Sequence, residues 1–456
     1  MNRFIKSIFI GKLFGYKDIS IDFTEDCYIL VGENGSGKTT VLNCMYSILS
    51  NRMDLLSNIR FDNIILTIMN NKKIEIHKYE VEAKLEKENG FSNTPFYRTI
   101  QRDLDTKQIR VLRDIIYSNE MMPQKKESEI ISQLNKLGFR FKSSSSYIYK
   151  NIQKLVQEQL AEELDHKLED LQSMIDFKLI FMPTYRRIES SMLNFESIAK
   201  RITRHYPFSD FNDIDFKSLI YEKENIQFGM RDVKSKINEI TQLINKKTKD
   251  SFPVIMANLL TYLSSDDSKP KIECNFDSSI INIILDRLGD QIKSEDKSRI
   301  RSYVSSRNLD NENLNYLISR LINLYKEQEI LDLSIKKFRD ICNNYLYDKK
   351  FVYDESSVDL YLELTNNNER IDLEYLSSGE KQIVSLFSSI CLDTESNFVV
   401  LFDEPELSLS VYWQENLLKD LLDTGKCNFL MAVTHSPYIY SKYLDDYAHA
   451  MFDIEI

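Results

Sequence analysis

The segment that most constrains the fold of this chain is Gly32-Glu33-Asn34-Gly35-Ser36-Gly37-Lys38-Thr39. It fits the phosphate-loop pattern G-x-x-x-x-G-K-[ST] at every fixed position. The apolar run 27–31 before it predicts a buried strand, and residues 40–50 after it predict a helix. Because strand, loop and helix follow one another in this order, the pattern predicts a nucleotide site in an α/β fold rather than a chance glycine-rich turn.

The residue types in this loop suit a phosphate chain. Glycines let the backbone wrap the phosphates with its N–H groups pointing inward, and the start of the helix adds the positive end of its dipole. Lys38 would reach the β- and γ-phosphates of ATP, and the Thr39 hydroxyl would ligate Mg²⁺. We therefore expect the nucleotide to be held by the loop residues Gly32, Asn34, Gly35, Ser36, Gly37, Lys38, Thr39 and Thr40.

Composition sets limits on the class of protein. With 456 residues the chain is long enough for two or three domains. Its net charge of −11 argues against nucleic-acid binding that depends on positive charge over the whole surface. No apolar run is long enough to span a membrane and no signal region opens the chain, so we expect a cytoplasmic protein. Disulfides and structural zinc are not expected, because no C-x-x-C pair occurs among Cys27, Cys44, Cys274, Cys342, Cys391 and Cys427.

Short strand patterns surround the phosphate loop. Residues 4–10 and 19–23 predict two strands, and the turn-rich link between them carries two aromatic side chains that would stack on a base or pack in the core. Residues 59–69 and 73–79 alternate apolar and polar side chains on either side of Asn70-Asn71. This alternation predicts a β-hairpin.

From about residue 81 the hydrophobic period becomes helical. Apolar residues at mostly three- and four-residue steps from 148 to 175 predict a long amphipathic helix. The apolar run 177–182 stops at Pro183 and predicts a strand that re-enters a sheet. Arg186-Arg187 follow, and at a strand end they would either meet a phosphate or form a solvated surface pair.

Two further segments carry a heptad period. One runs from Met230 to Ile244 and is expected to end at Phe252-Pro253, and the other runs from Leu314 to Tyr345. The second predicts a helix of roughly 50 Å. Such seams are typical of an antiparallel helical pair or short coiled coil, and equally of helices that pack as a bundle on the head. Gln328, the polar seam residue, would fix the register.

The second half of the site is expected near the C-terminal end of the chain. Strand patterns return at 350–354 and 358–364, and helices and strands then alternate. The run Phe398–Phe402 is apolar throughout, which is typical of a central parallel strand buried on both faces. It ends in Asp403 and Glu404 at the edge where open α/β sheets bind ligands. Asp403 would help hold Mg²⁺, and Glu404 would polarise the attacking water.

Two more segments complete the set of motifs. Leu376 to Gln382 opens a helix and fits a capping box, but its serines and glycine also suit an anion. We interpret it as a γ-phosphate contact made by Ser377, Ser378, Gly379 and Glu380. The apolar run 429–433 predicts a third buried strand that ends in Thr434-His435-Ser436-Pro437, where His435 is either a γ-phosphate sensor or a structural histidine.

The phosphate loop, Leu-Ser-Ser-Gly-Glu, Asp-Glu-Pro-Glu and Thr-His-Ser-Pro, in this order and split by helices, resemble the SMC-like ATP-binding-cassette ATPases of repair and chromosome maintenance. In particular, the chain is similar to AAA-type ATPases of prokaryotic antiviral systems and to the overcoming-lysogenization-defect nucleases. The resemblance covers about residues 1–80 and 345–456. It implies an α/β head in two lobes, split by a helical or coiled-coil insertion over 81–344 in which 177–189 returns to the head as a strand.

The resemblance also implies an ATP sandwich. Ser377, Ser378 and Gly379 of one subunit would close on the γ-phosphate held by Lys38 of another, so that ATP drives a homodimer or a higher ring. Chemistry would fall to Lys38, Asp403, Glu404 and His435. Two features depart from the family pattern: Ser378 replaces the usual first glycine of the signature, and no residue matches the family's Gln-loop glutamine. Residues 406–410 take the D-loop position without its usual Leu-His pair.

The first functional hypothesis is the ATPase subunit of an antiviral complex that holds or releases a nuclease. Because few residues follow His435, the nuclease is expected to act in trans. A toprim-type partner, as in phage-anti-restriction-induced systems, is favoured over an HNH-type partner, as in Septu-type systems. A phage-encoded trigger protein or DNA is a further candidate partner, and no membrane partner is expected.

The second hypothesis is a DNA-repair or chromosome-maintenance ATPase that clamps DNA between heads and coil. Its candidate contacts are the basic residues Arg186, Arg187, Lys200, Arg201, Arg204, Lys246, Lys247 and Lys249. A transporter ATPase is the third hypothesis. It is disfavoured because the ATPase heads of transporters are compact, with their motifs closer together in the sequence. Here 365 positions separate Lys38 from Asp403 (403 − 38).

Overall fold

The computed structural model describes residues 4–33, 35–88, 102–118, 122–139, 144–183, 230–264, 276–289, 292–306 and 310–451. Some residues singled out above lie outside these ranges: Asn34, Arg186, Arg187, Lys200, Arg201, Arg204, Cys274 and the end of the strand expected at 177–189. In the described part of the chain, no helix is both long and apolar enough to cross a membrane.

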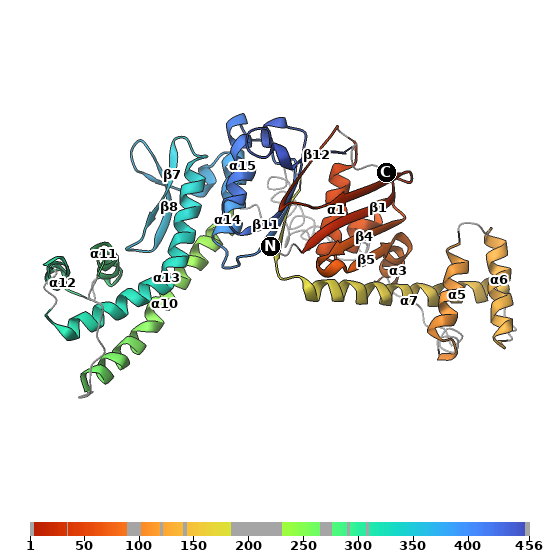
Figure 1. The fold of residues 1–456 in the computed structure, drawn as a ribbon, viewed down its shortest axis with the longest axis horizontal. Helices are drawn as coiled ribbons and strands as arrows, with labels where there is room; N and C mark the ends of the chain where they lie inside the picture. The colour runs from red at the N-terminus through yellow and green to blue at the C-terminus, as the bar shows by residue number, and fades with distance from the viewer. Residues whose placement is uncertain are drawn as a thin grey trace, which may run out of the picture.

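A parallel sheet of five strands forms the centre of the molecule (Figure 1). In spatial order the strands are β12 (Ala448–Ala450), β3 (Cys27–Val31), β11 (Cys427–Thr434), β10 (Phe398–Asp403) and β6 (Lys178–Met182). Every residue of β10 is buried, as its unbroken apolar run predicts. The predicted strands β3, β6, β10 and β11 are confirmed. They place the ends of β3, β10 and β11 at one edge of the sheet.

An antiparallel sheet of four strands lies beside the parallel sheet. Its order is β2 (Lys17–Asp22), β1 (Ile5–Leu13), β4 (Asn63–Ile68) and β5 (Lys73–His77). The predicted hairpin is β4 and β5, and its turn places Asn70 and Asn71 at positive φ, which asparagine tolerates. Helix α1 (Lys38–Leu49) shares one apolar core with both sheets, while the short α2 (Met53–Ser57) follows it. Most of α1 is therefore buried.

Helices α14 (Ser378–Cys391) and α15 (Val411–Leu422) share a second core with the other face of the parallel sheet. The same core includes a small antiparallel sheet of β7 (Lys349–Asp354), β8 (Asp359–Leu364) and β9 (Arg370–Ile371). The head is therefore a mixed α/β structure whose parallel sheet has apolar cores on both faces. This confirms the predicted fold class.

Two helical projections leave the head on opposite sides (Figure 1). The α7 projection contains α3 (Lys78–Glu88), α5 (Thr106–Ile116), α6 (Pro123–Lys136) and α7 (Ser145–Met174). The long helix predicted over 148–175 is α7. One half of it packs on the head through Leu164, Leu168 and Leu171, and the other half packs on α5 and α6. The predicted division of the chain at residues 80 and 344 stays a prediction.

The α10–α13 projection contains α10 (Met230–Ser264), α11 (Ser278–Arg287), α12 (Ser294–Ser306) and α13 (Glu312–Asn343). Helices α10 and α13 run antiparallel, since Thr248 hydrogen-bonds Gln328 and the ring of Tyr262 stacks 4.0 Å from that of Tyr316. Near the head both helices pack on α14, and α13 also packs on β7, while farther out α11 packs on α13 and α12 shares their apolar cluster. The structure therefore shows an antiparallel helical pair whose inner half packs on the head.

Two details of these helices were predicted wrongly. Helix α10 does not end at Phe252-Pro253 but continues to Ser264. Pro253 costs about 3 kcal/mol inside a helix, but Ile255 and Tyr262 are buried beyond it and offset this cost. In the outer half of α13 the predicted seam residues are only partly buried, because α11 draws a neighbouring face into the core. That face carries Tyr316, Ile318, Ile322 and Tyr325.

A buried polar network joins the α10–α13 projection to the small sheet. The Arg287 guanidinium donates to Asp332 at 2.7 Å and to Gln328 at 3.3 Å. The Tyr353 hydroxyl of β7 also donates to Asp332, and its burial beside this carboxylate raises the pKa of Tyr353 well above its usual range. The Arg287 and Asp332 side chains are 6% and 1% exposed, so each charge is shielded from water and is compensated by the other.

We expect Arg287→Met to destabilise the α10–α13 projection by about 3–5 kcal/mol, because Asp332 would stay buried without its counter-ion. The measurement is the midpoint of thermal unfolding followed by helical circular dichroism. Arg299→Met is the matched control, since Arg299 pairs with Asp296 at an exposed site and should change stability by at most about 1 kcal/mol. Equal losses from the two variants would contradict the role assigned to the buried pair.

Candidate nucleotide-binding site

The phosphate loop follows β3 directly and opens α1. Gly35 and Gly37 have φ values of 80° and 106°, a left-handed conformation that favours glycine. Gly37 is the N-cap of α1 and makes no side-chain cap bond, so the helix presents backbone N–H groups at its start. This is the local geometry that binds anions at a helix N-terminus.

Lys38 points back into this loop. Its Nζ donates to the carbonyl oxygens of Gly32 and Glu33, both at 2.9 Å, and lies 2.9 Å from His435 Nε2. Burial lowers the pKa of Lys38, while nearby carboxylates oppose this shift. Ser36 Oγ is buried and has no hydrogen-bond partner among the described residues. A phosphate oxygen would satisfy this hydroxyl, so the loop fits the phosphate chain of ATP.

Thr39 and Asp403 lie together although 364 positions separate them. The Thr39 Oγ1 hydroxyl donates to Asp403 Oδ1 at 2.9 Å, and Asp403 is 2% exposed at the end of β10. A hydroxyl and a carboxylate oxygen are ligands that Mg²⁺ prefers. The two predicted metal residues therefore fit that ion.

Glu404 leaves β10 with a φ of 52°, in the left-handed region. Its N–H donates to the carbonyl of Val433 at 2.8 Å, and its Oε1 lies 3.2 Å from His435 Nε2. Burial, together with the carboxylates of Glu406 and Asp403, raises the pKa of Glu404 to about 7, against the effect of Lys38. A pKa near the working pH suits a general base, because the carboxylate can both accept and release a proton.

His435 lies between Lys38 and Glu404 at the end of β11. Its pKa is lowered by burial first and by the Lys38 ammonium second. A lowered pKa favours the neutral imidazole. Four predicted residues from widely separated parts of the sequence are thus brought together: Lys38, Asp403, Glu404 and His435.

Glu406 is a site residue that the sequence reasoning missed. Its carboxylate accepts hydrogen bonds from Thr434 Oγ1 at 2.7 Å, from His435 N at 2.9 Å and from Ser436 N at 3.1 Å. The resemblance gives residues 406–410 the D-loop position and gives Glu406 no role of its own in the site. The second glutamate of Asp-Glu-Pro-Glu is the available signal, because a carboxylate there can accept hydrogen bonds from the end of a neighbouring strand.

We expect Glu406→Gln to lower the turnover of ATP about tenfold or more, because an amide has one acceptor oxygen and would release part of the His435 loop. ATP affinity should change little, since the phosphate loop keeps its contacts. Steady-state hydrolysis and nucleotide titration measure the two effects. Glu415→Gln is the matched control, because Glu415 pairs with Lys442 on the surface of α15. Wild-type turnover in Glu406→Gln would contradict the anchoring role.

The start of α14 has a different environment. Ser377 and Glu380 form a capping box, and Glu380 also pairs with Lys349 at 3.3 Å. The Glu380 side chain therefore bonds Ser377 and Lys349 of its own chain, and its contact with the γ-phosphate stays a prediction. Ser377 and Ser378 are exposed, and no hydrogen bond in the described part of the chain joins them to the phosphate loop.

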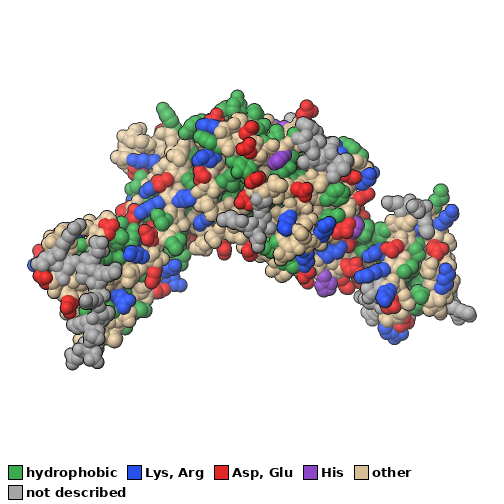
Figure 2. All heavy atoms as spheres, in the orientation of Figure 1, with side chains coloured by type: hydrophobic (Ala, Val, Ile, Leu, Met, Phe, Trp, Pro, Cys, Tyr) green, Lys and Arg blue, Asp and Glu red, His purple; other side chains and the backbone are tan. Residues whose placement is uncertain are grey.

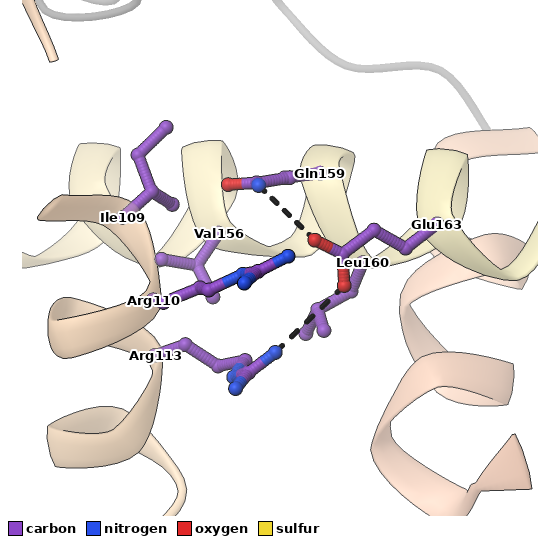
Figure 3. Close-up of a pocket in the computed structure, with 7 residues that line it drawn as sticks. All are labelled: Ile109, Arg110, Arg113, Val156, Gln159, Leu160 and Glu163. Atoms are coloured by element: carbon purple, nitrogen blue, oxygen red, sulfur yellow. Dashed lines mark hydrogen bonds and ion pairs between the residues drawn. The ribbon is translucent and has the colours of Figure 1, made fainter. Parts of the chain in front are cut away.

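Other candidate positions lie away from this cluster. Lys246, Lys247 and Lys249 are exposed on α10. Figure 3 shows a small pocket between α5 and α7, lined in part by Arg113, Gln159 and Glu163. Within it Gln159 Nε2 donates to Glu163 at 3.1 Å, and Arg113 lies 3.7 Å from the same carboxylate. This pocket belongs to the packing of the α7 projection.

One protein family and several solved structures are similar to this chain. A family model described as "AAA ATPase domain" matches residues 4–440. No curated protein matches the chain. Two of the similar solved structures have low TM-scores. One is the Smc head domain of Pyrococcus furiosus with an extended coiled coil, bound to the C-terminal domain of ScpA (11% identity, 96% of this chain, 90% of that chain, TM-score 0.33). The other is the SmcHead bound to the C-winged helix domain of ScpA (10%, 96%, 91%, TM-score 0.32).

Proposed function

The chain belongs to the AAA ATPase domain family, and we propose that it hydrolyses ATP with Mg²⁺ in a site completed by a second copy of the chain. The observation that carries the proposal is the cluster at the ends of β3, β10 and β11. There Lys38 and Glu404 each lie within about hydrogen-bond distance of His435, while Thr39 bonds Asp403.

Each residue of this cluster has a role in the proposed reaction. Lys38 and the loop N–H groups would bind the β- and γ-phosphates, and Thr39 and Asp403 would hold Mg²⁺, which supplies charge neutralisation when bound. Glu404 would accept the proton of the attacking water. The water oxygen would bond to the γ-phosphorus, and the bond between that phosphorus and the bridging oxygen of the β-phosphate would break. His435, held by Glu406, would contact the γ-phosphate between Lys38 and Glu404.

The exposed serines at the start of α14 support the proposal of an ATP sandwich. A helix N-terminus that carries Ser377 and Ser378 suits a phosphate, and these serines have no hydrogen bond to the phosphate loop of their own chain among the described residues. A second copy would then supply the nucleotide that they contact.

Subunit complementation tests this arrangement. Lys38→Ala and Ser378→Arg should each be inactive alone. Mixed together, they would form one site with an intact Lys38 from one copy and an intact Ser378 from the other. Recovery of ATPase activity on mixing supports the sandwich, whereas an active Ser378→Arg variant, or no recovery on mixing, would contradict it.

A finer proposal concerns the biological setting. The motif order resembles that of antiviral ATPases, so we propose a nuclease effector as partner, toprim-type in preference to HNH-type, with a phage protein or DNA as the trigger. Expression of the natural operon, with and without Lys38→Ala, followed by phage challenge and affinity purification, tests this setting. Equal phage survival in both strains, with no co-purified nuclease, would overturn it.

The alternative is an SMC-like ATPase that clamps DNA. The exposed Lys246, Lys247 and Lys249 on α10 favour it. On the face drawn in Figure 2, however, basic and acidic side chains of the described residues intermingle over both projections, and the net charge is −11. DNA-stimulated ATPase activity that falls steeply with salt would favour this alternative.

A further inference from the structure

Gln414 on α15 joins two loops of the head through both ends of its side-chain amide. Its Oε1 accepts from the Ser436 hydroxyl at 2.7 Å, directly after His435. Its Nε2 donates to the carbonyl oxygens of Leu409 at 3.0 Å and of Glu406 at 3.4 Å. One side chain therefore links the His435 loop to the segment 404–409.

The segment 404–409 is a compact unit. Leu407 N donates to the carbonyl of Glu404, and Leu409 N donates to that of Glu406, both at 3.2 Å. Glu404 and Ser408 have φ values of 52° and 67°, a left-handed conformation that costs non-glycine residues about 1 kcal/mol or more each. Such a conformation persists only where surrounding contacts hold it, and Gln414 supplies contacts at one end of the unit.

The same end of this segment, at Ser408, lies against the start of α14. A Cβ atom built on Gly379 would lie 2.7 Å from the Ser408 carbonyl oxygen and 3.0 Å from the Trp413 ring. Only glycine therefore fits at this position, and Ser408 is in close contact with the turn that carries Ser377 and Ser378. Because packed elements shift together, a movement of segment 404–409 would move these serines.

We propose that Gln414 is a positioning residue that couples a subunit's own nucleotide to the surface that serves the nucleotide of a second copy. A γ-phosphate at His435 shifts the Ser436 loop, Gln414 passes this shift to segment 404–409, and Ser408 passes it to the start of α14. The effect on a second copy rests on the proposed ATP sandwich. The relay, by which we mean the path from His435 through Ser436, Gln414 and Ser408 to the start of α14, lies within one chain.

The first test compares Gln414→Leu with Asn416→Leu, both in a Glu404→Gln background. Asn416 is the matched control because its amide donates to the carbonyl of Tyr412 on the exposed side of α15 and, among the described residues, joins no other loop. For Gln414→Leu we expect ATP affinity within twofold of the background, and a tenfold or greater rise in the protein concentration needed for ATP-driven assembly. Ser436→Ala should act similarly, and the Gln414–Ser436 double variant should add little to either single change.

The second test uses hydrogen exchange at protein concentrations below assembly. ATP should change the exchange of peptides covering residues 377–380 in the wild type and leave them unchanged in Gln414→Leu. Unaltered assembly together with a wild-type exchange response would overturn the relay. A wild-type protein that never assembles with ATP would overturn the sandwich alone, since the exchange response still reports on the relay. Equal thermal unfolding midpoints show that the variants are folded.

Discussion

Lys38→Ala is expected to abolish ATP binding at micromolar nucleotide and to reduce hydrolysis to background. The ammonium makes charge-assisted contacts that are each worth about 1.5–3 kcal/mol, so loss of two such contacts to phosphate weakens affinity about 100-fold or more. In the structure the Lys38 ammonium donates to the loop carbonyls of Gly32 and Glu33. Titration of a fluorescent ATP analogue measures the loss.

The control for this variant is Lys72→Ala. Lys72 lies on the surface, 2.9 Å from Asp170, and should leave both affinity and turnover unchanged. Because Lys38 also contacts His435, the thermal midpoint of Lys38→Ala should be measured beside the titration. A folded Lys38→Ala protein that binds ATP with wild-type affinity would remove the phosphate loop from the site.

Glu404→Gln is expected to keep nucleotide binding and to lower turnover about 100- to 10,000-fold. The amide has nearly the shape of the carboxylate but cannot accept the proton of the attacking water, and general-base catalysis contributes about this factor. Since ATP then persists in the site, the closed assembly should accumulate. Rapid-quench hydrolysis and light scattering with ATP measure the two effects.

The control for the second variant is Glu374→Gln, an exposed acid that pairs with Lys381 at 3.0 Å near the start of α14. It should hydrolyse ATP at the wild-type rate. Wild-type turnover in Glu404→Gln would assign the base to another group, and Glu406 would be tested next because its carboxylate adjoins that of Glu404.

Much of the head follows from local sequence patterns. The apolar run at 398–402 predicts a strand buried on both faces because no polar side chain interrupts it, and β10 is buried throughout. The charged pair after that run predicts a site at the sheet edge, and Asp403 does bond Thr39 of the phosphate loop. In these elements local pattern and tertiary environment agree, so reasoning from one chain is sufficient.

Other features depend on contacts that no local pattern reports. Helix α10 continues past Pro253 because residues beyond it pack on α13. The buried stripe in the outer half of α13 is set by a third helix, so the heptad alone misplaces it. The roles of Glu406 and Gln414 rest on hydrogen bonds to neighbouring loops that only the folded head brings within reach.

The position of β3 in the parallel sheet has a consequence for biosynthesis. Its two sheet neighbours are β11 and β12, so the strand that carries the phosphate loop has no partner in the sheet until β11 has left the ribosome. Lys38 and Thr434 are 396 positions apart (434 − 38), which takes roughly 20–80 s at ribosomal rates of about 5–20 residues per second. During that time the antiparallel sheet, complete by His77, can form, but the apolar side of α1 that faces β10 and β11 stays uncovered. Nascent chains of this protein should therefore depend on chaperones, and should acquire ATP binding only after β11 has left the ribosome.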